Sequence, residues 1–482
     1  MANKVNQHDH KVHLIEKCQV GPLPGSVPSP NFVPLSFFDL AMLICPTSCK
    51  RIFYYDFPYH KSEFLEKVLP NLKQSLSLAL KHFFPLCSNI IFPPKPQTPH
   101  ILYSEGDTLT FIVAESTANF NNLASHTPKS ITSLDDFVPI LPSPSTLEDG
   151  ILLITPMSIQ VTILPNYGFT ICFNFSHVIT DGRGFQNFLK LWSSLCMLKE
   201  DMFSSKAGLL YFSSLTKDNI SDPNKLKSIF LEKLWSMPLN RIGQMEMDNF
   251  IPKNVANQMV RQTIVLTHDH IANLKKLVSM KCQNLGLGTS LHVSTFMVTC
   301  SLVWVSNIKS KVAELGVDEF PIEDEDFYFG VLSDCRYLSE LKIPLTYFGN
   351  CLATAVAVVK RSKLEGENGI FEAAIAIGRK IKELQSEPYK GVETLMSMFT
   401  SYDATISQRI LGITGSPKLG SYEIDFGWGK PKLTEILHVN HPGVFSLCPC
   451  RDIEGGVEVG IALESSHMDK FNIILNELLT NL

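Results

Sequence analysis

A histidine and a carboxylate stand four residues apart in the segment His177-Val-Ile-Thr-Asp181, a spacing that suits acid–base chemistry. Apolar and polar residues alternate from Phe169 to Ser176, which predicts a β-strand that leads directly to the histidine. Glycines at positions 182 and 184 then end the strand, and apolar residues recur at helical spacing after them. We therefore expect His177 at a strand-to-helix turn, where a rigid scaffold can present its imidazole as a general base.

The same segment also has an ordinary structural interpretation. His177 could be a hydrogen-bonded core histidine, and Asp181 could cap the helix that follows. In a chain with 14 histidines, an accidental His-x-x-x-Asp is roughly as likely as not. The local pattern therefore leaves both interpretations open.

A second segment with chemical potential lies near the C-terminus and reads Asp425-Phe-Gly-Trp428-Gly. Its glycines permit a tight turn, and the Trp428 indole N–H could donate a hydrogen bond to a ligand oxygen. Alternatively, Asp425 accepts hydrogen bonds from turn amides and Trp428 packs as a buried plug. This segment alone does not separate a ligand contact from a structural turn.

Taken together, His177-x-x-x-Asp181 and the Asp425–Gly429 segment resemble the paired signatures of the plant BAHD acyltransferases. Further similar segments run along most of the chain: Leu35-Ser-Phe-Phe-Asp39, Ser75-Leu-Ser-Leu-Ala-Leu, Gly106-Asp-Thr-Leu and Gly455-Gly-Val-Glu-Val-Gly460. The segment Tyr347-Phe-Gly-Asn-Cys351 is similar to the mark of a subgroup that acylates anthocyanins and phenolic glycosides, many of its members being malonyltransferases. The resemblance therefore covers essentially the whole sequence.

This resemblance implies an α/β fold of two chloramphenicol-acetyltransferase-like domains with an active-site channel between them. Acyl-CoA, as cosubstrate, and a small-molecule acceptor would enter the channel from opposite faces. His177 would take the proton from an acceptor hydroxyl, and Trp428 would donate to the oxyanion that develops. No permanently bound cofactor or metal is implied. The expected acceptor is a phenolic glycoside; malonyl is the favoured acyl group, with acetyl and hydroxycinnamoyl open.

The resemblance also gives Asp181 a structural role, because in the family it pairs with an arginine of the other domain. Arg336 is the expected partner, since a buried carboxylate needs a countercharge. Asp425 is likewise expected to be architectural. Arg183 could bind the free carboxylate of a malonyl group or form a salt bridge at the channel wall.

Ser416 and Lys418 lie in the segment that leads to the second motif, and both are candidate contacts of CoA. Lys418 could neutralise a phosphate, and a solvated surface lysine is equally compatible with the sequence.

The elements that position these residues follow from local patterns. A hairpin is expected to join residues 161–164 to the strand ending at His177, and another strand is expected over 12–20. A helical pattern runs from Leu65 to Phe83 with a break at Pro70, and a helix is expected to start at Thr267. The 482 residues, 45% of them hydrophobic, exceed one typical domain. We predict an N-terminal domain over 1–204, a crossover segment over 205–240 and a C-terminal domain over 241–482.

Composition excludes several other classes. A formal net charge of −5 argues against a nonspecific nucleic-acid binder, and no apolar run is long enough to cross a bilayer. Without an apolar signal core, the chain is expected to be cytoplasmic, and we expect a monomer. The 12 cysteines are scattered, so we expect reduced thiols. Cys448-Pro-Cys450 and His268-Asp-His270 lack the spacing of a metal site and are interpreted as structural.

Three alternatives remain: transfer to a non-glycoside alcohol or amine, hydrolysis with His177 activating water, and non-catalytic binding of a small molecule. No Gly-x-Ser-x-Gly nucleophile motif supports a hydrolase. The formation of an acylated product that depends on acyl-CoA would distinguish among them.

Overall fold

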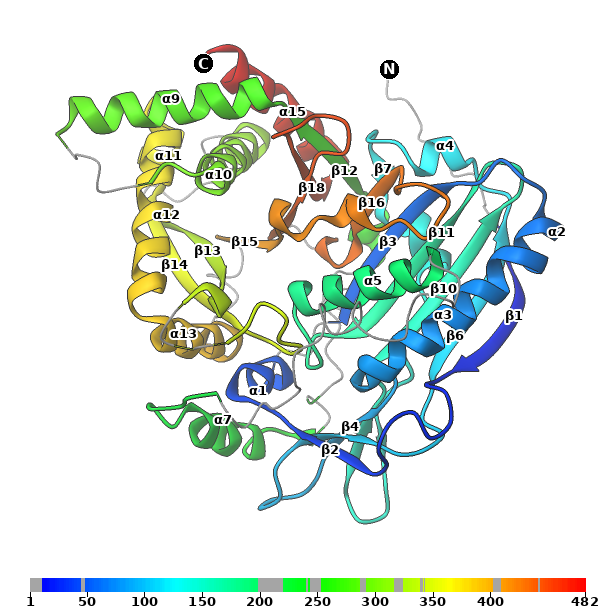
Figure 1. Ribbon diagram of the computed structural model, residues 1–482. Helices are drawn as coiled ribbons and strands as arrows, with labels where there is room; N and C mark the ends of the chain where they lie inside the picture. The colour runs from blue at the N-terminus through cyan, green and yellow to red at the C-terminus, as the bar shows by residue number, and fades with distance from the viewer. Residues whose placement is uncertain are drawn as a thin grey trace.

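The computed structural model describes residues 11–44, 48–197, 220–239, 242, 253–286, 292–315, 324–338, 341, 343–401, 409–440 and 443–482. Two halves lie side by side, and each is built on a β-sheet with helices packed against it (Figure 1). The fold is mixed α/β, as expected. Of the predicted crossover segment, residues 205–219 and 240 lie outside the described residues.

Within the described residues, six strands form the sheet of the N-terminal half in the order β1-β6-β10-β11-β3-β16. These are β1 (Val12–Val20), β6 (Leu109–Ser116), β10 (Met157–Leu164), β11 (Gly168–Ser176), β3 (Ser48–Asp56) and β16 (Leu433–Ile436). Helices α3 (Leu69–His82) and α5 (Gly182–Met197) lie over one face of this sheet (Figure 1). Trp192 of α5 donates its indole N–H to Ser75 Oγ of α3 at 3.1 Å, so the two helices are hydrogen-bonded as well as packed.

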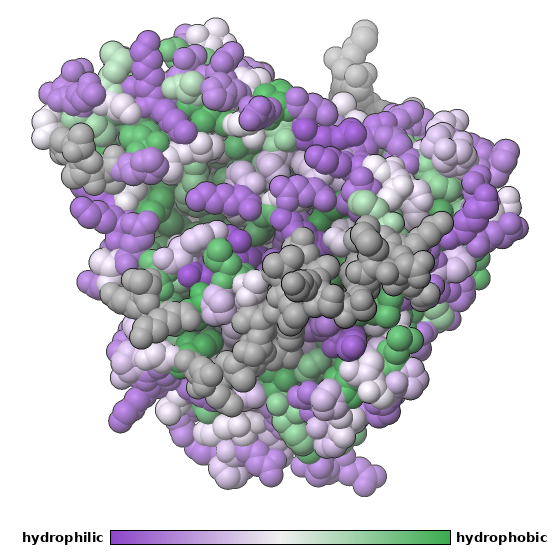
Figure 2. Space-filling view, viewed as in Figure 1, coloured by the Kyte–Doolittle hydropathy of each residue, from purple (hydrophilic) through white to green (hydrophobic). Residues whose placement is uncertain are grey.

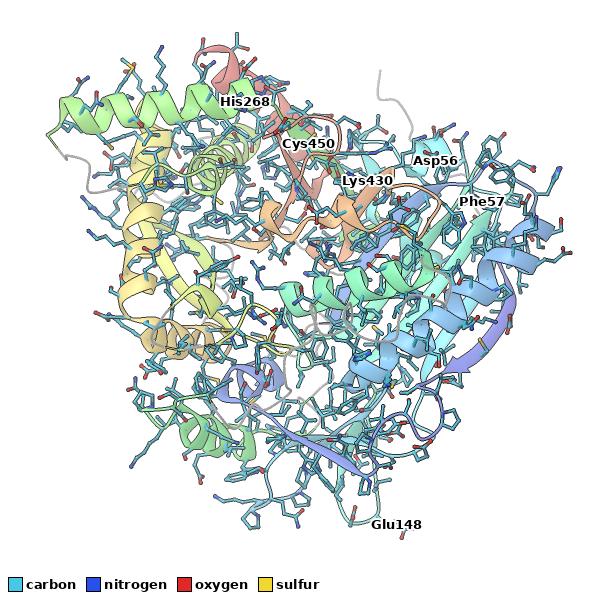
Figure 3. The ribbon with its side chains drawn as sticks, in the orientation of Figure 1. Asp56, Phe57, Glu148, His268, Lys430 and Cys450 are labelled. Atoms are coloured by element: carbon cyan, nitrogen blue, oxygen red, sulfur yellow. The ribbon has the colours of Figure 1, made fainter. Side chains whose placement is uncertain are left out.

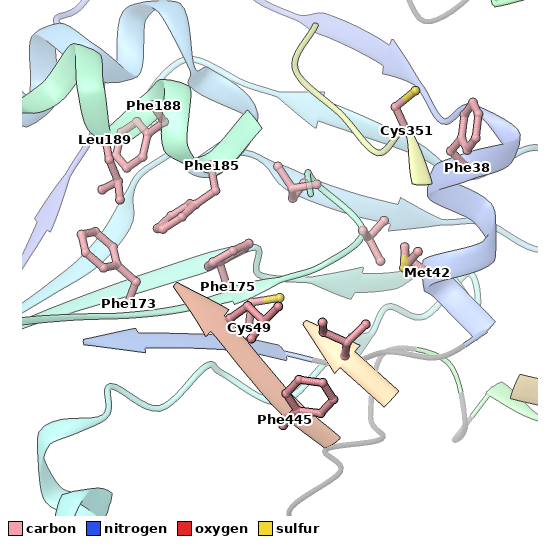
Figure 4. Packing of buried hydrophobic residues seen from close by; sticks show 14 of the residues in the cluster. Phe38, Met42, Cys49, Phe173, Phe175, Phe185, Phe188, Leu189, Cys351 and Phe445 are labelled. Carbon is pink, nitrogen blue, oxygen red and sulfur yellow. The ribbon is translucent and has the colours of Figure 1, made fainter. Parts of the chain in front are cut away.

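The hairpin that leads to His177 forms as predicted, with β10 and β11 antiparallel in register from Leu164↔Gly168 to Met157↔Phe175. One face of β11 packs its phenylalanines against α5 (Figure 4). The other face carries polar residues and is also buried, because residues 131–139 cover it. Asn174 on this face donates to the Pro139 carbonyl at 2.9 Å, so its polar group is satisfied without water. The alternating pattern therefore marks two buried faces of different polarity.

The strand predicted over 12–20 is β1. The predicted helix over 65–83 begins earlier, with α2 (Lys61–Glu63) and a π-helical turn (Phe64–Val68) ahead of α3. Pro70 occupies the first turn of α3, directly after the π-helical turn, and it has no N–H to bond a carbonyl of that turn. The break predicted at the proline is therefore a change of helix type just before it.

The sheet of the C-terminal half has the order β14-β13-β15-β17-β18-β12-β7 in the described residues. Its strands are β14 (Leu352–Lys360), β13 (Asp326–Asp334), β15 (Ile410–Gly415), β17 (Val444–Pro449), β18 (Val457–Glu464), β12 (Met259–Leu266) and β7 (Lys129–Ser130). Its helices are α8 (Lys253–Ala256), α9 (His268–Asn284), α10 (Thr295–Leu315), α11 (Arg361–Glu365), α12 (Gly369–Ser386), α13 (Pro388–Ser401) and α15 (Ser465–Thr480). Thr267 caps α9 in a capping box with His270, which explains the His-Asp-His run.

Each half contributes a strand to the sheet of the other half. β7, from the N-terminal part of the sequence, pairs with β12, and β16, from the C-terminal part, pairs with β3. Each sheet therefore contains one strand from the other half of the sequence, held by backbone hydrogen bonds.

A smaller sheet and several short helices complete the described fold. The sheet has the order β2-β5-β4-β9-β8, with β2 (Asn31–Pro34), β5 (His100–Tyr103), β4 (Asn89–Phe92), β9 (Leu152–Ile154) and β8 (Ser145–Thr146). The short helices are α1 (Phe37–Ile44), α4 (Phe120–Leu123) and α7 (Leu226–Trp235). α1 packs against α7 and α13, so an N-terminal helix contacts the C-terminal half (Figure 1).

Hydrophilic side chains are spread over both halves on the face drawn in Figure 2. Among the described helices, none is long and apolar enough to cross a membrane.

Candidate active site

His177 directly follows β11 and precedes α5. The strand ends at Ser176 and the helix begins at Gly182, as the sequence predicts. Below this turn the rings of Phe175 and Phe185 stack with centroids 4.2 Å apart (Figure 4). Residues 178–181 are buried, whereas His177 is half-buried. The backbone is therefore fixed by the core while the imidazole keeps an accessible edge.

One nitrogen of the imidazole is occupied by a residue of the C-terminal half. His177 Nδ1 lies 3.0 Å from Asn350 Oδ1, in the segment that follows β13 and precedes β14. Asn350 is fully buried and donates back to the His177 backbone carbonyl at 2.8 Å. The side chain of His177 is therefore held at the junction of the halves, with Nε2 left for a ligand.

Asp181 forms an ion pair that also crosses the junction. Its Oδ2 accepts from Arg336 Nη1 at 2.7 Å, and its Oδ1 accepts from Arg336 Nη2 at 3.1 Å. The backbone N–H groups of Arg183, Gly184 and Cys351 also donate to this carboxylate. Burial alone would raise the pKa of Asp181, but the Arg336 charge and these hydrogen bonds outweigh it and hold the pKa below its ordinary value.

The geometry of this ion pair is the structural one implied for Asp181 and Arg336. Within the described residues, no hydrogen bond joins Asp181 to His177, and Asn350 occupies the position that an orienting carboxylate would take. Asp181 instead caps α5, because its side chain accepts hydrogen bonds from the backbone N–H groups of Arg183 and Gly184.

Gly349 lets the chain pass closely beside Arg336. Its φ is +152°, and a Cβ at this position would lie 2.5 Å from Tyr347 Oη. The carbonyls of Tyr347 and Gly349 both accept from Arg336 Nη2, at 3.2 and 2.9 Å. The segment Tyr347–Cys351 therefore wraps around the buried guanidinium and delivers Asn350 to His177.

Arg183 is engaged by acidic and aromatic partners at the same junction. Its Nε donates to Asp334 Oδ2 at 2.5 Å, and its Nη2 donates to the hydroxyl of Tyr337 at 2.6 Å. The guanidinium also lies over the Tyr337 ring, 5.1 Å from its centroid. Arg183 was expected either to bind a malonyl carboxylate or to form a salt bridge. Its contacts are those of a salt bridge.

Trp428 lies far from His177, which contradicts the oxyanion role that the resemblance led us to expect. Its ring packs edge-to-face on Phe169, with centroids 5.9 Å apart, at the opposite end of β11 from His177. Eight residues of strand separate the two positions, roughly 26 Å at ~3.3 Å per residue. Figure 3 marks this end of the sheet by Phe57, whose ring contacts Phe169. An indole at this distance cannot donate to an oxyanion beside His177.

The turn around Trp428 is built locally by Asp425. Its Oδ1 accepts from the backbone N–H of Gly427 at 2.7 Å and of Gly429 at 3.0 Å, and both glycines have positive φ. The segment is therefore an architectural turn that closes the end of the N-terminal sheet.

Ser416 and Lys418 lie in the loop between β15 and this turn. Ser416 Oγ accepts from the Lys418 backbone N–H at 3.2 Å, and the Lys418 side chain is exposed. The loop borders the first turn of α5, because a Cβ on Gly182 would lie 3.3 Å from Leu419. Ser416 and Lys418 therefore lie near the start of α5, the helix that follows the His177 motif.

A second histidine stands near His177 that sequence patterns do not single out. His438 Nδ1 accepts from the Lys50 backbone N–H at 3.3 Å, so its proton lies on Nε2, 3.3 Å from Thr414 Oγ1. Burial, and then the charge of His177, lower the pKa of His438 to about 3. His438 is therefore neutral at physiological pH and adds no positive charge beside the base.

Known proteins resemble this chain in sequence and in fold. The model of the family described as the Transferase family matches residues 11–477, nearly the whole chain. The chain belongs to this family, the BAHD acyltransferases.

Several curated relatives are named for anthocyanin or phenolic glucosides, and agmatine coumaroyltransferase of Arabidopsis thaliana, 30% identical over 95% of this chain, is named for an amine. Coumaroyl-CoA:anthocyanidin 3-O-glucoside-6''-O-coumaroyltransferase 1 of Arabidopsis thaliana is 37% identical over 96% of this chain and 97% of its own. Malonyl-coenzyme A:anthocyanin 3-O-glucoside-6''-O-malonyltransferase of Dahlia pinnata is 33% identical, covering 96% of each. Phenolic glucoside malonyltransferase 1 of Nicotiana tabacum is 32% identical over 90% of this chain and 91% of its own. The chain is an acyl-CoA-dependent acyltransferase of specialised metabolism.

Solved structures of two acyltransferases share the fold of the chain. Vinorine synthase aligns with a TM-score of 0.67 at 18% identity, over 97% of this chain and 98% of its own. The TRI101 protein of F. sporotrichioides, solved with coenzyme A and T-2, aligns with a TM-score of 0.60 at 14% identity, over 94% and 98%. At these identities the likeness concerns the fold alone.

The sequence predicted the place of His177 and the pairing of Asp181 with Arg336, but it did not predict the contacts of Asn350. Its segment resembles the subgroup motif, yet nothing in the pattern indicates that the amide reaches His177, 173 residues earlier. The described residues contain no group of three or more His, Cys, Asp or Glu that could hold a metal ion.

Proposed function

We propose that this BAHD enzyme transfers an acyl group from acyl-CoA to a hydroxyl of a phenolic glycoside, with His177 as general base. The observation that carries the proposal is the His177–Asn350 hydrogen bond. It engages Nδ1 of the half-buried His177 and supports Nε2 as the nitrogen that takes the proton of the acceptor.

The chemistry needs one base and no covalent enzyme intermediate. Nε2 of His177 takes the proton of the acceptor hydroxyl while its oxygen attacks the thioester carbonyl. The tetrahedral intermediate then collapses, the C–S bond breaks, and the CoA thiolate takes the proton from the imidazolium. The products are an ester and free CoA, and the imidazole is neutral again.

The acyl donor is a finer proposal, and the contacts of Arg183 bear on it. A malonyl group carries a free carboxylate, which needs an unengaged cation in a site that excludes water. Arg183 already faces Asp334 and Tyr337, so it offers little to such a carboxylate. We therefore propose a hydroxycinnamoyl donor alongside malonyl, in line with the coumaroyl-CoA relative and the malonyl-CoA relative above.

The remaining proposals concern CoA contacts and the state of the protein. Ser416 and Lys418 border the start of α5, which supports a contact with the pantetheine arm or a phosphate of CoA. We also propose that the enzyme works as a cytoplasmic monomer without a bound metal.

The experiment compares wild type with His177→Ala, using coumaroyl-, malonyl- and acetyl-CoA with a panel of phenolic glycosides, and follows free CoA and product mass. We expect acylation by wild type that requires the acceptor, and a loss of at least about 100-fold in kcat for His177→Ala. Circular dichroism and binding of acyl-CoA serve as folding controls. Retention of activity by a folded His177→Ala protein would refute the role of His177.

A further inference from the structure

We propose that Asp39 and Asn350 form a relay that fixes the proton of the His177 imidazole on Nδ1 and leaves Nε2 as the base. Both are positioning residues, since they act on the reaction through His177. The proposal rests on the proposed function. It gives a role in the reaction to Asp39, which lies 138 positions before His177.

The relay begins at the first turn of α1. Asp39 is fully buried, and its Oδ2 accepts from Ser36 Oγ at 2.6 Å and from the Ser36 backbone N–H at 2.9 Å. Its Oδ1 accepts from Asn350 twice, from the backbone N–H at 3.0 Å and from Nδ2 at 2.9 Å. The carboxylate therefore holds both the backbone and the side chain of Asn350 in place.

The contacts of Asn350 determine which way its amide faces. Its Nδ2 lies within hydrogen-bond distance of three acceptors: Asp39 Oδ1, the His177 carbonyl at 2.8 Å and the Val178 carbonyl at 3.2 Å. An amide oxygen in that position would meet three oxygens, so the NH₂ group must occupy it. The amide oxygen consequently faces His177 Nδ1 at 3.0 Å.

This orientation fixes the tautomer of the base. Asn350 Oδ1 can only accept, so His177 Nδ1 must carry the proton and donate it. The lone pair of the neutral ring is then on Nε2, the nitrogen assigned to the acceptor hydroxyl. When Nε2 takes a second proton, the polarised amide and the Asp39 carboxylate behind it stabilise the imidazolium.

The charged groups around the imidazole come from several elements. Asp39 of α1 acts through Asn350, Asp181 is neutralised by Arg336, and His438 lies in the turn Leu437–Val439. Arg51 of β3 and its neighbour Lys50 lie on the side of His438. Because burial keeps His438 uncharged down to about pH 3, a change at the relay can be measured around neutral pH without a second titration from His438.

The test uses a swap of the two relay groups. Asp39→Asn alone places an NH₂ group against donors, and we expect kcat to fall by at least about 10-fold, the lower end of the loss seen when an outer-shell partner of a metal-bound histidine is removed. Asn350→Ala should cause a similar loss. The double variant Asp39→Asn/Asn350→Asp places a carboxylate directly beside Nδ1, so the acid limb of kcat/KM should move up by about one pH unit. Its kcat should stay below that of wild type, because the second carboxylate oxygen faces the His177 and Val178 carbonyls.

A matched control makes the same chemical change on the strand that carries His177. Asn174 is a buried asparagine of β11, three residues before the histidine and on the face covered by residues 131–139. Asn174→Asp should lower stability and leave the pH limb where it is in wild type. A limb that moves equally in the control would overturn the proposal, as would wild-type kcat in a folded Asn350→Ala protein.

A readout independent of activity separates this proposal from the proposed function. ¹⁵N-histidine NMR distinguishes the two nitrogens, and His177→Gln assigns the signal. We expect the Nδ1–H tautomer in wild type and its partial loss in Asn350→Ala, even if none of the tested substrates reacts. An Nε2–H tautomer in wild type would overturn the relay, whereas an inactive wild type with the Nδ1–H tautomer would overturn only the choice of substrates.

Discussion

The buried ion pair Asp181–Arg336 gives a quantitative prediction for the variant Asp181→Ala. The substitution removes the carboxylate and leaves the Arg336 guanidinium in the core with its charge uncompensated by Asp181. Breaking a buried pair from one side costs about 3–5 kcal/mol of unfolding free energy. The structure places this case at the low end, because Arg336 keeps Asp334 Oδ1 at 3.1 Å and the Gly349 carbonyl at 2.9 Å.

A second contribution comes from the backbone amides that Asp181 accepts from. The N–H groups of Arg183 and Gly184 at the start of α5 lose their cap, which typically costs about 1 kcal/mol. Adding this to about 3 kcal/mol for the ion pair gives an expected loss of about 4 kcal/mol. The catalytic constant of the folded variant should fall much less than that of His177→Ala, because Asp181 does not contact the imidazole.

The assay is urea unfolding at pH 7 for wild type, Asp181→Ala and the double variant Asp181→Leu/Arg336→Met. The double variant removes both charges and should recover at least half of the lost stability. Glu63→Ala, which removes an exposed i,i+4 partner of Lys67, serves as control and should cost under about 0.5 kcal/mol. A loss below about 1 kcal/mol for Asp181→Ala, or a fully folded variant with activity as low as His177→Ala, would refute a purely structural role.

Two further predictions follow from residues away from His177. Trp428→Phe should keep kcat within about threefold of wild type, because the ring packs on Phe169 at the far end of β11; a loss like that of His177→Ala would restore an oxyanion role. Burial raises the pKa of Glu458 to about 7, so its neutral form stabilises the fold fully below pH ~4.5 and this contribution is lost as the pH rises through 7. Relative to Glu458→Gln, wild type should lose up to about 3 kcal/mol of unfolding free energy between pH 5 and 8, and parallel curves from urea unfolding would contradict the shift.

Local patterns in the sequence predicted the elements that present the base. The alternation through β11, the glycines at the start of α5 and the hairpin with β10 each arise from neighbouring residues, and the structure has all three. The cap at Thr267 is equally local, since its partners lie within three residues. Such features depend on backbone geometry and side-chain shape near one point of the chain, and these can be inferred from one sequence.

The contacts that complete the site could not be inferred in this way. Asp39 and Asn350 are 311 positions apart, and only the packing of α1 against the C-terminal half brings them together. Trp428 illustrates the opposite error. Its motif is recognisable and its indole can donate, but its distance from His177 is set by the length of β11 and not by any residue of the motif.

The exchange of β7 and β16 between the sheets affects the order in which the sheets can form during synthesis. The N-terminal sheet receives its last strand only after residue 436 has been made, although its other strands are complete by residue 176. Until then β3 exposes an unpaired edge, which is a template for pairing with other chains. When β16 pairs with β3, the half-buried Lys432 just before it lies 3.6 Å from Asp56, and the buried Glu435 forms an ion pair with Arg261 at 3.3 Å. The N-terminal sheet therefore keeps its β3 edge unpaired until residues 433–436 have been made.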